Sequence, residues 1–65
     1  MVGKKIIELK ELRELRKISR KELASQLGVS PVSIWKWEGG QDMYLSNAVK
    51  IKHILDPDNE YSIKF

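Results

Sequence analysis

The stretch that decides the fold covers residues 19–38 and reads SRKELASQLGVSPVSIWKWE. Its first serine can cap a helix, and Glu22 follows at the spacing of a capping box. Gly28 can end that helix, because glycine adopts a left-handed backbone without a Cβ clash. Ser30-Pro31 then provides a second cap and a proline at the first helical position. The pattern predicts two short helices joined by a tight turn.

Apolar residues in this stretch recur at helical spacing, which places them on one side of each expected helix. In the second helix, Ile34 and Trp37 are three residues apart and should face inward. The first helix presents Leu23, Ala24 and Leu27 in the same way. Two such helices around a glycine turn indicate a helix-turn-helix motif.

The motif resembles the Cro/CI (Xre) family of phage and bacterial regulators over about residues 6–55. The resemblance rests on Leu23-Ala24, Gly28-Val29-Ser30, Ile34, Trp37-Glu38 and Gly40, with Leu12-Arg13 before them and the Leu45–Leu55 segment after them. It implies an all-α, small lambda-repressor-like domain, and the pattern of this chain predicts four helices with a short extended C-terminal tail, without the family's fifth helix.

At 65 residues the chain is expected to form a single domain over 1–65, with its core in 6–55 and a tail at 56–65. Residues 1–5 are expected to be a frayed basic arm, and Asp42 could cap the last helix. The expected helices cover about residues 6–17, 20–27, 31–38 and 44–55.

The tail alternates apolar and polar side chains, as a half-buried strand does. Its apolar residues are Tyr61, Ile63 and Phe65. Because no other segment has a strand pattern, one interpretation is that the tails of two copies pair antiparallel and form a dimer. The alternative is a tail that folds back on the last helix as a cover or is disordered.

Composition excludes several classes of function. The chain has no cysteine and a single histidine, His53, so disulfides, cysteine-based zinc sites, paired-histidine metal sites and hydrolytic triads are not expected. We therefore expect no enzymatic activity, no metal and no cofactor. The chain has no run of about 20 apolar residues, and Lys4 and Lys5 interrupt its start too soon for a signal peptide, so a cytoplasmic (nucleoid-associated) protein is expected.

The net charge of +3 is modest, but basic residues crowd the first third of the chain. A one-sided positive field is typical of a phosphate-binding face. The alternative is a solvated helix in which Glu8, Glu11 and Glu14 pair with basic neighbours.

The family resemblance implies that helix 31–38 enters the major groove. Pro31 and Val32 can pack on thymine methyl groups, and Lys36 can donate to guanine or to a phosphate. Pro31 and Ser30 could instead serve only to start the helix. The residues expected at the bases are Ser30, Pro31, Val32, Ser33 and Lys36.

Contacts with the DNA backbone are expected at the start of helix 20–27 and in the loop after helix 31–38. Trp35 could donate its indole N–H to a phosphate, or could pack on the preceding helix or on a partner subunit. The residues expected at the backbone are Ser19, Arg20, Lys21, Trp35 and Gln41.

The resemblance also implies a structural ion pair between Arg13 and Glu38, which would join helix 6–17 to the end of helix 31–38. Such a pair fixes geometry more than it adds stability. The alternative is that both side chains are merely exposed.

Together these features predict a transcriptional regulator, most simply a repressor, that binds double-stranded DNA as a homodimer on a near-palindromic operator. Half-sites would lie about one helical turn (roughly 34 Å) apart. No small-molecule effector is evident. The alternatives are an antitoxin or adapter that uses the same fold to bind protein, and a phage recombination accessory factor.

Overall fold

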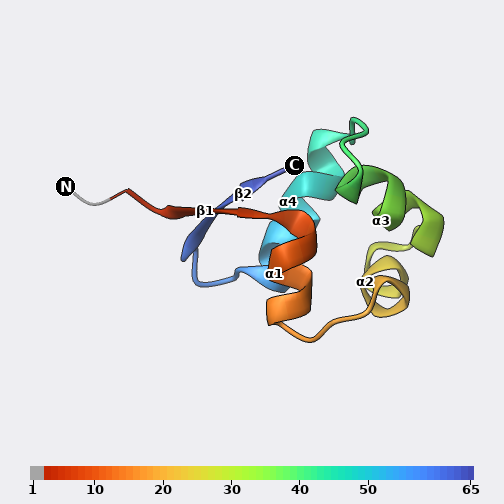
Figure 1. Ribbon diagram of the computed structural model, residues 1–65. Coiled ribbons are helices and arrows are strands. Elements are labelled where there is room, and N and C mark those ends of the chain that lie inside the picture. Colours follow the sequence, from red (N-terminus) through yellow and green to blue (C-terminus); the bar gives the residue numbers. More distant parts are fainter. Residues whose placement is uncertain (1–2) are drawn as a thin grey trace.

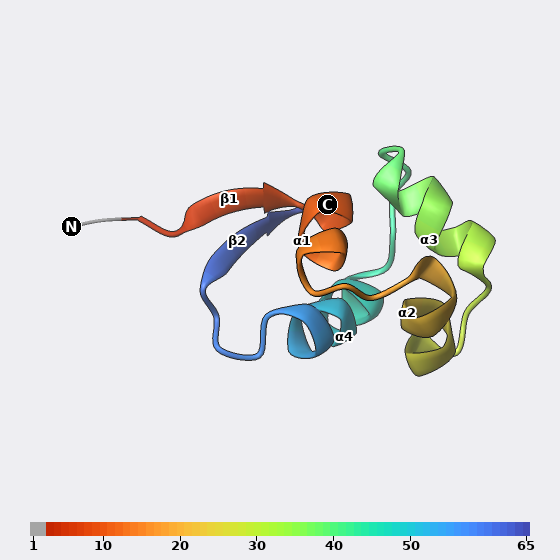
Figure 2. The same cartoon turned by 60° about the horizontal axis from the view of Figure 1, so that its bottom comes forward.

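The computed structural model describes residues 3–65 and forms four helices and two short strands (Figure 1). In chain order these are β1 (Lys5–Glu8), α1 (Leu9–Leu15), α2 (Arg20–Leu27), α3 (Pro31–Glu38), α4 (Leu45–Leu55) and β2 (Tyr61–Lys64). Figures 1 and 2 both show the strands side by side at one end of the molecule, with α2 and α3 at the other. The expected four-helix, predominantly α fold is confirmed, and the small sheet is an addition to it.

The core lies between the four helices and consists of aliphatic side chains. Leu12, Leu23, Ile34, Ile51 and Leu55 are fully buried, so every helix contributes at least one anchor. Fully burying an aliphatic side chain of this size contributes about 1.5–3 kcal/mol. Around this core pack the half-buried residues Ile18, Val29, Trp37, Met43, Ile54, Tyr61 and Ile63.

The start and stop signals of α2 and α3 lie where the sequence places them. The Ser19 hydroxyl accepts from the Glu22 N–H at 3.0 Å, and Gly28 ends α2 with a φ of +74°. The Ser30 hydroxyl accepts from the Ser33 N–H at 3.4 Å, and Pro31 occupies the first position of α3.

The prediction of a helix beginning at residue 6 is wrong, because residues 5–8 form a strand. Ile6 is 70% exposed and Ile7 is 7% exposed, an alternation that belongs to a strand rather than to a helical stripe. The segment pairs in parallel with β2, and Ile7 lies opposite Ile63. Two adjacent β-branched residues suit a strand, and this long-range pairing overrides the helical spacing seen in the sequence. Lys5, expected in a frayed arm, is part of the strand; residues 1–2 of that arm lie outside the described residues.

The tail therefore has a partner within its own chain, which the sequence analysis did not identify. Tyr61 lies opposite Lys5, and Tyr61 and Ile63 are half-buried against the core. Phe65 follows the strand and is 45% exposed. Within the chain the tail folds back and pairs with β1, rather than covering α4 alone. Pairing between the tails of two copies stays a prediction.

The expected cap of α4 by Asp42 is also wrong. The helix begins at Leu45, its cap position is Tyr44, and no side chain caps it. A helix capped by Asp42 would have to begin at Met43, two residues before the observed start of α4. The loop before it instead turns at Gly40, which has a φ of +99°.

A buried carboxylate closes the end of α4 and starts the tail. Asp56 is 1% exposed and accepts from the N–H groups of Glu60 and Tyr61 at 2.8 and 2.9 Å. Lys52 lies 3.7 Å and Arg16 3.9 Å from its oxygens. Burial alone would raise the pKa of Asp56, but the two N–H donors and the two cations outweigh it, so the pKa lies below its ordinary value of 3.8.

Arg16 joins this turn to α1. Its Nε donates to the Leu55 carbonyl at 2.8 Å, and its guanidinium lies 5.9 Å from the centre of the Tyr61 ring. The end of α1, the end of α4 and the start of β2 are therefore held by one side chain.

We predict that replacing Asp56 with Asn lowers stability at neutral pH and flattens its dependence on pH. A carboxyl whose pKa is lowered on folding stabilises the protein above its unfolded pKa and loses that contribution as the pH falls through its folded pKa. The free energy of unfolding of the wild type, measured with urea, should fall steeply below about pH 4. The free energy of unfolding of the variant should fall less over the same pH interval. Parallel curves for the two proteins would contradict this role.

We further predict that Lys17→Gly raises the unfolding free energy by about 0.5–1 kcal/mol. Lys17 has a φ of +58°, a conformation that costs little only for glycine. It lies two residues after the last residue of α1, directly after the cap residue Arg16, and its N–H donates to the Glu14 carbonyl at 3.0 Å. Lys21→Gly, the same replacement inside α2, is the control and should destabilise by about 1 kcal/mol; urea midpoints compare the two.

Candidate nucleic-acid interface

Helix α3 has one buried side and one side open to solvent. Ile34 is fully buried and anchors the inner side. Val32 and Trp35 are 56% and 61% exposed, and Lys36 is also exposed. These last three residues lie at spacings of three and four, so they share one surface. We call them the outer face of α3.

The first turn of α3 adds hydroxyl groups to this surface. Ser30 and Pro31 are exposed, and Ser33 is half-buried. The hydroxyls of Ser30 and Ser33 lie 3.5 Å apart. The five residues expected at the bases thus lie along α3 and its cap, although Ser33 is less accessible than the others.

Glu38 at the end of α3 binds two arginines. Arg13 Nε donates to its Oε2 and Arg20 Nε to its Oε1, each at 2.7 Å. The Glu38 side chain is 4% exposed, Arg13 9% and Arg20 37%. Arg13 also donates to the Ile18 carbonyl at 2.9 Å. Arg13 and Glu38 therefore form the pair implied by the resemblance, buried rather than exposed.

Arg20 contacts Glu38, a partner that the sequence did not predict. It was expected at the DNA backbone, but the structure engages its Nε with Glu38 and leaves the rest of the guanidinium at the surface. Arg20 is the first residue of α2 and lies 18 residues before Glu38, a separation that gives no sequence signal for such a contact. Of the other expected backbone residues, Ser19 and Lys21 are exposed at the start of α2.

The loop after α3 brings the remaining expected residues together. The Gln41 N–H donates to the Lys36 carbonyl at 3.1 Å, which folds the loop back on the helix. Trp35, Lys36 and Gln41 then line one shallow hollow. An indole N–H, an ammonium and an amide at one edge of α3 can all donate to a phosphate or a base.

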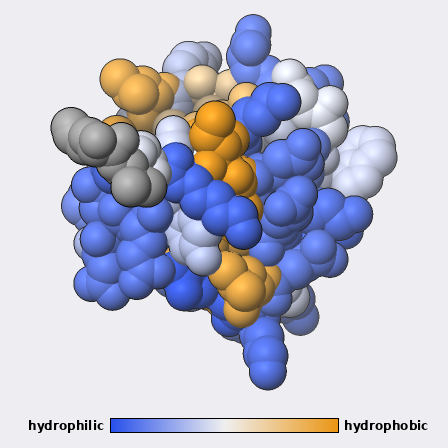
Figure 3. Space-filling model, turned by 60° about the vertical axis from the view of Figure 1, so that its left-hand side comes forward, coloured by the Kyte–Doolittle hydropathy of each residue, from blue (hydrophilic) through white to orange (hydrophobic). Residues whose placement is uncertain are grey.

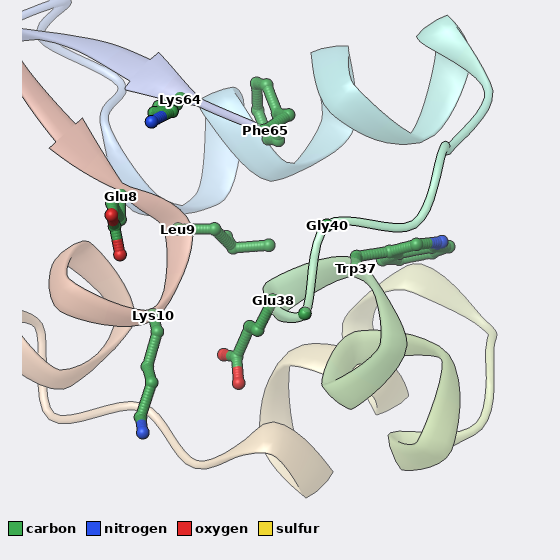
Figure 4. Close-up of a pocket in the computed structure, with 9 residues that line it drawn as sticks. Glu8, Leu9, Lys10, Trp37, Glu38, Gly40, Lys64 and Phe65 are labelled. Atoms are coloured by element: carbon green, nitrogen blue, oxygen red, sulfur yellow. The ribbon is translucent and has the colours of Figure 1, made fainter.

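Trp37 lies on the inner side of α3, as expected, but is only half-buried against the core. It also lines a second hollow, which Figure 4 shows between the ends of the strands, α1 and the loop after α3. Residues of both charges line this hollow, and no sequence pattern predicted it. Its lining comprises Glu8, Leu9, Lys10, Trp37, Glu38, Gly39, Gly40, Lys64 and Phe65.

Other kinds of site have less support in the described part of the chain. Within residues 3–65, no three acidic or histidine side chains lie close enough together to hold a metal ion. His53 is exposed on α4. None of the helices described has the length and apolar character required to cross a membrane.

Comparisons with known proteins agree with this geometry. Residues 6–61 match the model of a family described as "Helix-turn-helix domain". The chain is 46% identical over 48 residues to a protein of Methanocella arvoryzae named "Putative HTH-type transcriptional regulatory protein". The matched region is 74% of this chain but only 15% of that protein, so the chain corresponds to a small part of its relative. No solved structure gives a significant match.

We predict that Glu38→Gln lowers the unfolding free energy by about 3 kcal/mol, because it leaves the buried Arg13 guanidinium without its counter-charge. Glu14→Gln, which removes an exposed carboxylate from α1, should change stability by less than about 0.5 kcal/mol. Thermal and urea unfolding of both variants measure the difference. Equal stabilities would mean that the ion pair does not hold α3 in place.

Proposed function

The chain belongs to the helix-turn-helix domain family, and from this we propose that it is a sequence-specific DNA-binding regulator of transcription whose α3 enters the major groove. The observation that carries the proposal is the outer face of α3. Its side chains project into solvent from a helix that Ile34 and Glu38 fix to the rest of the domain. A rigid, exposed helix is what groove recognition requires.

The chemistry of this face suggests how bases are read. Val32 and Pro31 offer apolar contact to thymine methyl groups, and the Lys36 ammonium can donate to guanine O6 and N7. The start of α2 would meet the phosphate backbone through its N–H groups, Ser19 and Lys21. Arg20 already binds Glu38 at the end of α3. If the rest of its guanidinium binds a phosphate, that contact would also hold α3 more firmly.

We propose repression by occlusion as the mode of action, with two copies on a near-palindromic operator. A single copy of this size makes few contacts, so a second copy supplies affinity that one domain lacks. The alternative is a protein-binding adapter or antitoxin, which the exposed apolar groups Val32 and Trp35 would serve equally well. A recombination accessory factor would differ from both by bending its DNA.

Selection of bound sequences from a random DNA pool, at two salt concentrations, tests the proposal. We expect enrichment of an inverted repeat with half-sites about 10 base pairs apart. Enrichment of a single unrepeated half-site would support sequence-specific DNA binding but contradict a symmetric dimer on the operator. Absence of any sequence preference would favour the adapter.

We predict that Lys36→Gln weakens binding to the selected sequence about 10-fold or more and relaxes preference at one base position. If Lys36 contacts only a phosphate, the variant should instead lose affinity for all sequences alike. The number of ions released on binding, given by the salt dependence of the affinity, should then fall by about one. Lys50→Gln is the matched control, since it removes the same charge from an exposed site on α4. Fluorescence anisotropy with the selected and a scrambled duplex distinguishes these results, and equal affinities for the two variants would contradict base reading by Lys36.

A further inference from the structure

A further hollow lies between the C-terminal end of α3 and the first turn of α4. Its volume is about 440 Å³, which is in the range of pockets that hold small ligands. An indole, a phenol ring, a thioether, a carboxylate and an amide surround it. They belong to Trp37, Tyr44, Met43, Asp42 and Asn47. We call this space the α3–α4 hollow.

Local structure holds the walls of the α3–α4 hollow in place. The Gly40 N–H donates to the Trp37 carbonyl at 3.1 Å, where the chain leaves α3. The Asn47 N–H donates to the Tyr44 carbonyl at 3.0 Å in the first turn of α4. Trp37 and Met43 are half-buried against the core, and Figure 4 shows the Trp37 ring alongside the loop that leads to α4. The hollow is therefore preformed, and a ligand would lose little affinity to ordering its walls.

The α3–α4 hollow is negative although the chain as a whole is positive. Asp42 is the one lining side chain that is charged at neutral pH. It is exposed and does not cap α4, and within residues 3–65 its carboxylate forms no ion pair. The faces of the two aromatic rings add partial negative charge to that of the carboxylate. The hollow therefore favours a cation.

The lining also selects the kind of cation. Ca²⁺ takes about six to eight oxygen ligands, which one carboxylate and one amide cannot supply. An alkylated ammonium group instead carries its charge beneath an apolar surface that packs well on aromatic rings. The Tyr44 ring is 82% exposed, so it is free to make such a contact, and Trp37 and Met43 provide the apolar wall opposite the solvent. The hollow thus suits an organic cation better than a metal ion.

We propose that the α3–α4 hollow binds a small organic cation with an alkylated ammonium group. The charge lies beside Asp42, and the alkyl groups pack on the rings of Trp37 and Tyr44. Such binding does not require DNA. No small-molecule ligand was expected from the sequence, because Trp37 and Asp42 were assigned to the core and to a helix cap. On the side of the strands, by contrast, small hydrophobic groups lie among predominantly hydrophilic side chains (Figure 3).

Titration of the isotope-labelled chain with choline, followed by NMR, tests this site. The chain has two tryptophans, so the indole N–H signal of Trp37 reports on the hollow and that of Trp35 is an internal control. We expect saturable shifts at Trp37 and in residues 42–47, and none at Trp35. The uncharged alcohol in which carbon replaces the nitrogen of choline should bind at least about 5-fold more weakly. No saturable shift at millimolar choline, shifts centred on Trp35, or equal affinity for the alcohol would overturn the proposal.

Two pairs of variants identify the groups that bind. Asp42→Asn removes the counter-charge and should raise the choline dissociation constant at least about 5-fold, whereas Asp58→Asn, in the exposed turn after α4, should leave it unchanged. Tyr44→Leu should also raise the constant, whereas Tyr44→Phe keeps the ring and should not. Thermal unfolding establishes that the variants remain folded. Equal constants within either pair would contradict the assignment. Because these measurements use no DNA, their failure would leave the proposed function unaffected.

Discussion

The orientation of α3 depends on one carboxylate shared by two guanidinium groups. Glu38 lies at the C-terminal end of α3, Arg13 comes from α1 and Arg20 from the first turn of α2. The three helices meet at a charged group almost withdrawn from water, where each oxygen of the Glu38 carboxylate accepts from a different arginine at 2.7 Å. Ile34 secures the same helix by burial. The outer face of α3 is exposed because its opposite side is held by both interactions.

A second carboxylate performs the corresponding task for the tail. Asp56, which follows the last residue of α4, accepts hydrogen bonds from the N–H groups of Glu60 and Tyr61 in the turn before β2. Arg16 and Lys52 supply the counter-charge. The tail is thereby directed back toward α1, where β2 pairs with β1. Tyr44 and Leu45, at the start of α4, remain largely exposed.

The sequence predicted the parts of this structure whose signals are local. Ser19, Gly28 and Ser30 act within a few residues of their partners, so α2 and α3 were placed within a residue of their ends. Ile6 and Ile7 were misassigned because a four-residue strand has no signal of its own until Ile63, far along the chain, lies beside it. The contact of Arg20 with Glu38 and the role of Asp56 were not predicted for the same reason: their partners are set by how the helices pack. The residues expected at the bases lie along α3 and its cap, and Trp35, Lys36 and Gln41 line one hollow, but every contact with DNA remains a prediction.

The parallel arrangement of β1 and β2 has a consequence for how order spreads through the chain. Parallel strands cannot be joined by a tight turn, and here the connection between them is the entire helical region. The strands can meet only after the helices have brought them together, because bringing such distant segments together costs loop-closure entropy that local contacts do not. We therefore expect the sheet to form late in folding, after the helices between its two strands have packed. Opening of the sheet, in turn, is the natural first step by which this domain loosens.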